Sequence, residues 1–188
     1  MELIYAPSEW LSKAVKPFDF DKHNAVEIAQ NMVDIMDAHK GIGISANQVG
    51  IDAQIFVMQP TQHDELKEAF AIINPVIEKI SEETDLRYEG CLSHPNLFLK
   101  VQRPVKLVTR FLDADAKECI IVLNNYDARV FLHEYDHMEG KNFTDGVSKV
   151  KLDMAKKKQK KALIKAAIYK EQEEEREKQM KFGQSLIV

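Results

Sequence analysis

Residues 133–137 read His133-Glu134-Tyr135-Asp136-His137, and this H-E-x-x-H pattern decides how the rest of the chain is interpreted. Residues four positions apart lie on one face of a helix, so His133 and His137 would project side by side and could bind one metal ion. Glu134 would lie close enough to serve a metal-bound water as general base. The alternative is a solvated helix face that carries two incidental histidines.

Two histidines alone leave a metal short of ligands, because a catalytic site usually takes three protein ligands and keeps one position for water. After His137 the chain offers Glu139 and Asp145, and neither has a convincing spacing. Cys91 is the better third ligand, since thiolate binds divalent metals strongly and the preceding glycine frees the backbone. A lone cysteine is more often a buried core residue, a description that fits Cys119 in its apolar run better.

Length and composition predict one domain, with or without an appendage, since the chain has 188 residues of which 45% are hydrophobic. Two cysteines are too few for a disulfide framework. The first residues have neither a basic and apolar leader nor an Arg-rich transit pattern, and no apolar run approaches membrane-spanning length. We therefore expect a soluble cytoplasmic protein with no membrane partner.

Periodic patterns predict one helix over residues 24–39, with Asn24 as its N-cap and Gly41 just beyond its end. Residues 41–48 are rich in glycine and small side chains and would let a backbone approach closely. Alternating apolar residues predict strands at 54–58, 71–80, 105–111 and 119–123. The turn pattern at 113–115 predicts that the last two strands form a hairpin. The helix with both histidines is expected to start near Asn125 or Tyr126.

The charge is divided unevenly along the chain. From residue 149 onward there are 12 basic and 6 acidic residues, a net charge of +6, whereas residues 1–148 hold 14 basic and 24 acidic residues, a net charge of −10. Residues 149–181 contain neither glycine nor proline. They are predicted to form one long helix, or two helices joined by a flexible connection. An acidic body with a basic tail suggests that the tail meets an anionic partner.

Three blocks in this order resemble the three signature motifs of the peptide deformylases: GIGISANQ at 41–48, EGCLS at 89–93 and HEYDH at 133–137. The flanking residues agree, with Asn74-Pro75 ending a strand before the second block and Gly140-Lys141-Asn142-Phe143 after the third. The resemblance covers about residues 3–150, and the joint occurrence of three motifs is highly specific.

The resemblance implies an α+β fold of the peptide deformylase type, in which mixed and antiparallel strands wrap around a central metal-binding helix. Residues 1–148 would be the catalytic domain and 149–188 a charged helical extension. It also implies a hydrolase that removes the formyl group from the N-terminal formylmethionine of nascent polypeptides and releases formate. The implied metal is Fe²⁺, for which Zn²⁺, Ni²⁺ or Co²⁺ can substitute, although a Cys-His-His set by itself suggests zinc first.

The resemblance also assigns roles to residues. The metal ligands would be Cys91, His133 and His137. Glu134 would be the general base, and the Gln48 side chain and Leu92 backbone N–H would stabilise the oxyanion. The peptide would be held as an added strand by Ile42, Gly43 and Gly90. Glu89 and Asp136 would support the ligands from behind.

Several residues depart from the family pattern. Ser45 replaces the more usual alanine, and His94 follows EGCLS where the family prefers Ile or Val. As a fourth ligand His94 is not needed, because three ligands suffice. Three further departures are expected near the pocket for the methionine side chain and bear on substrate preference: Phe98, Tyr126 and Arg129.

Two other functions remain open at this point. A different metal hydrolase, such as a peptidase with the same H-E-x-x-H, would cleave internal peptide bonds and would not require Cys91. A deformylase-like body kept only as a ribosome-binding module would show damaged motifs. None is damaged, since the chain retains Gln48, Cys91, Leu92, His133, Glu134 and His137.

The tail gives a separate hypothesis. Bacterial deformylases often end in a basic helix that docks on the ribosome, and here a dense lysine block is followed by acidic residues; the lysines are Lys156, Lys157, Lys158, Lys160, Lys161 and Lys165. We expect this block to bind ribosomal RNA. The alternative is a helix that is merely solvated.

Overall fold

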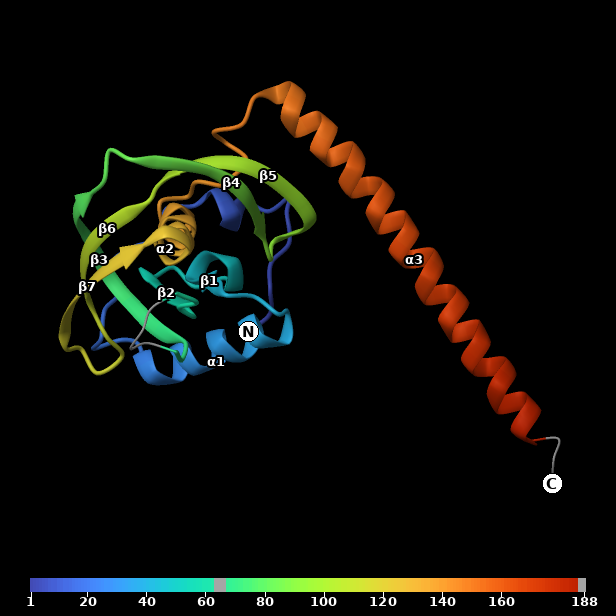
Figure 1. Ribbon diagram of the computed structural model, residues 1–188. Helices are drawn as coiled ribbons and strands as arrows, with labels where there is room; N and C mark the ends of the chain where they lie inside the picture. The colour runs from blue at the N-terminus through green and yellow to red at the C-terminus, as the bar shows by residue number, and fades with distance from the viewer. Residues whose placement is uncertain (63–66, 186–188) are drawn as a thin grey trace.

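The helix α2, Asn125–Met138, lies at the centre of the fold with strands wrapped around it (Figure 1). The computed structural model describes residues 1–62 and 67–185. Ten of the fourteen residues of α2 are buried, which explains why its apolar residues occur on all sides rather than in one stripe. The predicted helix start near Asn125 and the α+β fold class are both confirmed.

Five antiparallel strands form the main sheet, in the order β1-β2-β3-β6-β7. Their bounds are β1 Gly43–Ser45, β2 Ile55–Met58, β3 Phe70–Ile80, β6 Lys106–Leu112 and β7 Glu118–Asn124. The predicted hairpin is confirmed, because β6 and β7 pair from Leu112↔Glu118 onward. The register of β3 shifts between Ile73 and Val76, where Asn74 has a positive φ and Pro75 has no N–H to donate.

A second sheet consists of the hairpin β4, Thr84–Cys91, and β5, His94–Pro104, joined by Leu92 and Ser93. The sequence patterns predicted no strand between residues 81 and 104, and this was wrong. The reason is that most β4 side chains are exposed on both faces, so the strand lacks the apolar alternation that a half-buried strand has. Figure 1 shows this hairpin curving over one side of α2.

The first helix, α1, Ala25–Ala38, confirms the prediction for residues 24–39, and the Asn24 side chain accepts a hydrogen bond from the backbone N–H of Glu27. Gly41 follows the end of this helix as predicted, and its N–H donates to the carbonyl oxygen of Met36 at 2.8 Å. The left-handed residue after the helix is Lys40, with φ 55°, while Gly41 packs against Leu92. A Cβ on Gly41 would lie 2.7 Å from Leu92 Cδ1, so a larger residue there would require the Leu92 side chain to shift.

The core has two main parts on the two sides of the sheet. One lies between the sheet and α2 and includes Phe56, Ile72 and Phe131, with the rings of Phe56 and Phe131 packed edge to face. The other lies between the sheet and α1 and includes Met32 and Met36. Two short 3₁₀ helices, η1 Glu9–Ser12 and η2 Ala46–Val49, complete the body.

The C-terminal segment forms one continuous helix, α3, Lys149–Ser185, as one of the two predicted arrangements. Its first turns lean on β5, where Leu152 and Ala155 pack against a small cluster and Gln159 Nε2 donates to the carbonyl oxygen of Pro95 at 2.7 Å. The rest of α3 projects away from the body (Figure 1). Over the described residues, no helix combines the length and the apolar character needed to cross a membrane.

Candidate active site

The end of β4 and one face of α2 bring three metal-binding side chains together. Cys91 is the last residue of β4, and His133 and His137 lie one turn apart on α2. One candidate ligand atom from each residue lies within 4.8 Å of those of the other two, and Cys91 Sγ is 3.2 Å from His137 Nε2. Among the residues that the structure describes, this is the one group of three or more such side chains with this geometry. His94 does not belong to it.

The donor set and its electrostatics fit a divalent cation. A thiol and two imidazoles are the ligands that borderline divalent metals such as zinc and iron accept. Burial opposes a charge on His133, but its contacts with Cys91 and Glu89 hold the pKa of His133 well above its ordinary value. Burial and the neighbouring His133 lower the pKa of His137. The two imidazoles thus differ in how their surroundings treat a positive charge, because only His133 has Glu89 as a hydrogen-bond partner.

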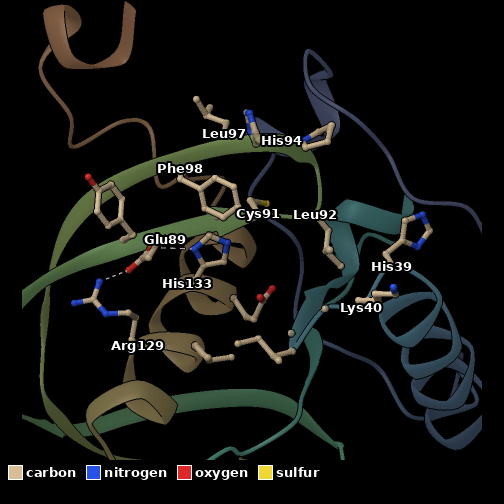
Figure 2. Close-up of a pocket in the computed structure, with 18 of the residues that line it drawn as sticks. His39, Lys40, Glu89, Cys91, Leu92, His94, Leu97, Phe98, Arg129 and His133 are labelled. Carbon is tan, nitrogen blue, oxygen red and sulfur yellow. Dashed lines mark hydrogen bonds and ion pairs between the residues drawn. The ribbon is translucent and has the colours of Figure 1, made fainter. Parts of the chain in front are cut away.

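Glu89 binds the ring nitrogen Nδ1 of His133 and so orients the imidazole. Its Oε2 atom lies 3.1 Å from His133 Nδ1, which leaves the other ring nitrogen of His133 for a metal (Figure 2). Arg103 donates to both oxygens of Glu89, from Nε at 3.0 Å and from Nη2 at 3.1 Å. Burial alone would raise the pKa of Glu89, but His133 and Arg103 hold it at about 2. Arg103 also donates to Asp136 Oδ2 at 2.5 Å, which ties both carboxylates to one guanidinium.

Arg129 makes a second clamp on Glu89 from α2 itself. Its side chain is only 2% exposed, and Nη1 donates to Glu89 Oε1 at 2.6 Å and to the carbonyl oxygen of Val101 at 2.9 Å. Nη2 donates to the backbone carbonyl and to the carboxylate of Asp85 on β4. Figure 2 shows Arg129 and His133 reaching Glu89 from two sides. Arg129 therefore connects α2 to both strands of the β4–β5 hairpin.

The candidate base Glu134 is buried beside β1. The Ser45 hydroxyl shares its proton between the backbone carbonyl oxygen of Glu134 at 2.8 Å and the Oε2 atom at 2.9 Å. Burial raises the pKa of Glu134 to about 7. Gly43 faces the other carboxylate oxygen, and a Cβ on Gly43 would lie 2.5 Å from Oε1. The carboxylate is thus confined between Ser45 and Gly43, next to the ligand group.

The segment 41–48 supplies polar side chains as well as close backbone contact. Gln48 Oε1 accepts from the Ser45 backbone N–H at 2.8 Å, which orients the amide. Its Nε2 donates to Ser93 Oγ at 3.0 Å and lies 3.4 Å from Cys91 Sγ. Asn47 Nδ2 donates to the carbonyl oxygen of His137 at 2.6 Å. These contacts hold the amide of Gln48 against the thiol end of the site.

A cavity of about 480 Å³ opens over this group. Its walls come from β1, β4, β5 and α2, and include the predicted peptide-contacting residues Ile42, Gly43 and Gly90 together with Leu92. The three residues predicted near a side-chain pocket also line it: Phe98, Tyr126 and Arg129. His94 lines the same cavity with its ring edge to face with Phe143 at 5.5 Å, and burial lowers its pKa.

The family model described as "Polypeptide deformylase" matches residues 1–153. The chain belongs to the peptide deformylase family. A curated peptide deformylase from Bartonella henselae is 34% identical over 159 residues, which are 85% of this chain and 90% of the relative. These enzymes remove the formyl group from an N-terminal methionine, and the family depends on a metal.

Solved deformylase structures agree with the fold. A peptide deformylase from Legionella pneumophila matches with a TM-score of 0.78 at 31% identity, covering 88% of this chain and 96% of that one. The Ehrlichia chaffeensis deformylase solved in complex with actinonin matches with a TM-score of 0.75 at 34% identity, covering 86% and 96%. The deformylase fold predicted from the three motifs is therefore confirmed.

Sequence reasoning missed three contacts of this deformylase site. Arg103 was not considered, and Arg129 was expected only near the substrate pocket, although both bind Glu89. Ser45 was treated as a small change, yet it contacts the carboxylate of Glu134. The need of a buried Glu89 for cationic partners is the one signal in the sequence that could have indicated the contacts of Arg103 and Arg129. Cys119 is half-buried against the core, as predicted for a packing residue.

Proposed function

We propose that this chain removes the formyl group from the N-terminal formylmethionine of nascent polypeptides, with Cys91, His133 and His137 as its metal ligands. The observation that carries the proposal is the convergence of these three ligand atoms within 4.8 Å, beside a buried carboxylate and at the base of a cavity. We infer Fe²⁺ as the native ion by family resemblance, with Zn²⁺, Ni²⁺ or Co²⁺ as substitutes. A bound divalent ion would supply Lewis acidity and lower the pKa of a water molecule.

The proton transfers are assigned to Glu134. It would accept a proton from the attacking water and then pass this proton to the amine that leaves. A carboxylate whose pKa is near neutrality can do both, and burial raises the pKa of Glu134 to about 7 in the absence of an ion. Ser45 holds one oxygen, so Oε1 is the atom left to exchange the proton.

The oxyanion that forms on the formyl carbon needs donors. We assign this role to the Gln48 side-chain amide and the Leu92 backbone N–H. Gln48 suits this role because its Nε2 donates to Ser93 Oγ at 3.0 Å but makes only a long contact of 3.4 Å with Cys91 Sγ. The N–H directed at Cys91 can therefore turn to the oxyanion. Removal of one such donor typically lowers the rate by about 100- to 1000-fold.

Peptide binding is assigned to backbone groups. The strand β1 is the edge of the main sheet, with β2 on one side only, and the cavity separates it from β4. An extended peptide could add to this edge through Ile42, Gly43 and Gly90, a mode that reads little of the side chains. Such recognition suits an enzyme that must accept many nascent chains. Glu89 and Asp136 would act indirectly, by keeping His133 and Arg103 in position.

The experiment that tests the proposal is formate release from formyl-Met-Ala by protein purified without oxygen. Glu134→Gln keeps the shape of the side chain but cannot take the proton, so activity should fall by about 100-fold or more. Glu139→Gln changes an exposed carboxylate five positions further along and serves as the matched control. No release by the unaltered protein with its metal confirmed would refute the proposal.

We further propose that residues 1–148 act as the catalytic domain in the cytoplasm and that the extension 149–188 binds ribosomal RNA through its lysines. Exposed lysines on α3 support this, because phosphate contacts need accessible cations; they are Lys156, Lys157, Lys158, Lys160, Lys161 and Lys165. Ribosome pelleting should decrease with salt and disappear on truncation after Val150. Equal pelleting with and without the extension would refute RNA binding while leaving the deformylase proposal intact.

A further inference from the structure

The outer part of α3 has side chains that nothing in the described structure covers. Ile164 is 52% exposed and Ile168 is 48% exposed, on a helix that projects from the body (Figure 1). Leu163 and Tyr169 beside them are also exposed. Isoleucine has a below-average helix propensity, so its use on a free helix surface does not help an isolated helix to form. These residues therefore point to a partner.

The charges on both sides of this apolar segment have opposite signs. Before it lie the lysines of residues 156–161 and within it lies Lys165, whereas Lys170 and then Glu171, Glu173 and Glu174 follow it, all exposed. The sequence adds glutamates at 175 and 177. Lys157, Lys161 and Lys165 are spaced four apart, and like charges at this spacing destabilise a lone helix. A partner with the reverse order of charges would reduce the repulsion within both the basic and the acidic block. RNA would reduce it only within the basic block.

One face of α3 has the spacing of a coiled coil. Positions recur alternately four and three residues apart, which keeps them on one side of two supercoiled helices. The residues of this stripe are Val150, Met154, Lys157, Lys161, Ile164, Ile168 and Glu171. Val150 is 70% exposed and Met154 is 67% exposed, so the stripe faces away from the side on which Leu152 packs against the body. A second helix can therefore approach it without displacing β5.

We propose that α3 pairs with α3 of a second copy of this chain as an antiparallel two-helix coiled coil centred near residue 166. In that arrangement, positions equally far from residue 166 face each other. Ile164 then meets Ile168 of the second copy, and Lys161 meets Glu171 of the second copy. A parallel pair would instead place Lys161 against Lys161 and Glu171 against Glu171.

The pairing should be weak and depend on concentration. Only Ile164 and Ile168 are apolar at its centre, and an interface of this kind falls below the size of stable complexes. We expect a dissociation constant of roughly 10–100 µM, with monomers at about 1 µM. Ribosomal RNA and the second copy would compete for the same lysines, so the paired form would be the state away from the ribosome.

Sedimentation equilibrium of the full metal-loaded chain tests the proposal through charge reversal. Lys161→Glu and Glu171→Lys should each weaken self-association at least about tenfold, because each creates two like-charged contacts across the two-fold axis. An equimolar mixture of the two variants should associate as well as the unaltered chain, since every mixed contact again joins a lysine to a glutamate. The double variant K161E/E171K should also self-associate normally.

Two further variants control for net charge. Lys170→Glu and Glu173→Lys make the same charge changes on faces of α3 outside the stripe and should leave association unchanged. Helix content by circular dichroism and formate release should be unaltered in all variants, so failure here is distinguishable from failure of the proposed catalytic function. A chain that stays monomeric up to several hundred micromolar, or a mixture that fails to restore association, would overturn the pairing. Loss of ribosome pelleting in K161E with no dimer would assign the lysines to RNA alone.

Discussion

Replacing Gly43 by alanine tests whether the position of Glu134 is essential. The new Cβ would lie 2.5 Å from Glu134 Oε1 and 2.9 Å from both Cγ and Cδ, where an ordinary contact is 3.4–4 Å. The carboxylate must therefore move by roughly 1 Å. It cannot do so freely, because Ser45 holds Oε2 and the backbone carbonyl of the same residue.

The expected loss follows from these contacts. A displacement of about 1 Å at a reacting group costs roughly 100-fold in rate, and overpacking a buried site costs about 1–3 kcal/mol of stability. We expect kcat for formate release to fall about 100-fold, while the metal content of the protein stays the same because Cys91, His133 and His137 are not touched. The melting temperature should fall by a few degrees.

The assay compares kcat, KM, metal content and thermal unfolding for the unaltered protein and four variants. Gly146→Ala is the matched control, since a Cβ there would have no heavy atom within 4 Å and should change nothing. Combining Gly43→Ala with Glu134→Gln should give no loss beyond that of Glu134→Gln alone, because both act through one carboxylate. Near-normal kcat in a fully metallated Gly43→Ala protein would refute the view that Glu134 works in the position seen here.

Four other outcomes are expected. Arg129→Met should weaken metal retention about 10- to 100-fold in chelator competition and destabilise the fold by roughly 3–5 kcal/mol in chemical denaturation. Arg87→Met, which changes an exposed arginine, should have little effect on either quantity. Gly90→Ala places a Cβ 2.7 Å from the Phe98 ring and should raise KM, with Phe98→Leu restoring it. Chelation of the metal should lower the melting temperature, by an amount corresponding to about 4 kcal/mol if the ion was present at 1,000 times its Kd. Lys13 and Lys16 lower the pKa of Asp52 to about 2. The stabilisation by Asp52 is therefore present above its unfolded pKa and lost as the pH falls toward 2. In Asp52→Asn the melting temperature should fall less steeply over this acidic range.

Local patterns predicted those parts of the fold that local interactions determine. The α2 helix and the shared face of His133 and His137 follow from a spacing of four residues. The cap at Asn24 and the hairpin of β6 and β7 likewise depend on residues close in sequence. The Cys91 ligand was chosen by its chemistry and by resemblance, and its role stays a prediction, although the structure brings its sulfur to 3.2 Å from His137.

The amino-acid sequence by itself determined the helices, the main hairpin, the family and the residue types of a metal site. Only the tertiary structure decided how that site is supported, because its supporting contacts join residues 14 to 90 positions apart. The β4–β5 hairpin carries Glu89 to Arg129 and His133, and β1 carries Ser45 to Glu134. No local pattern encodes such pairs, since they exist only when the hairpin folds over α2 and buries charges that must then be paired.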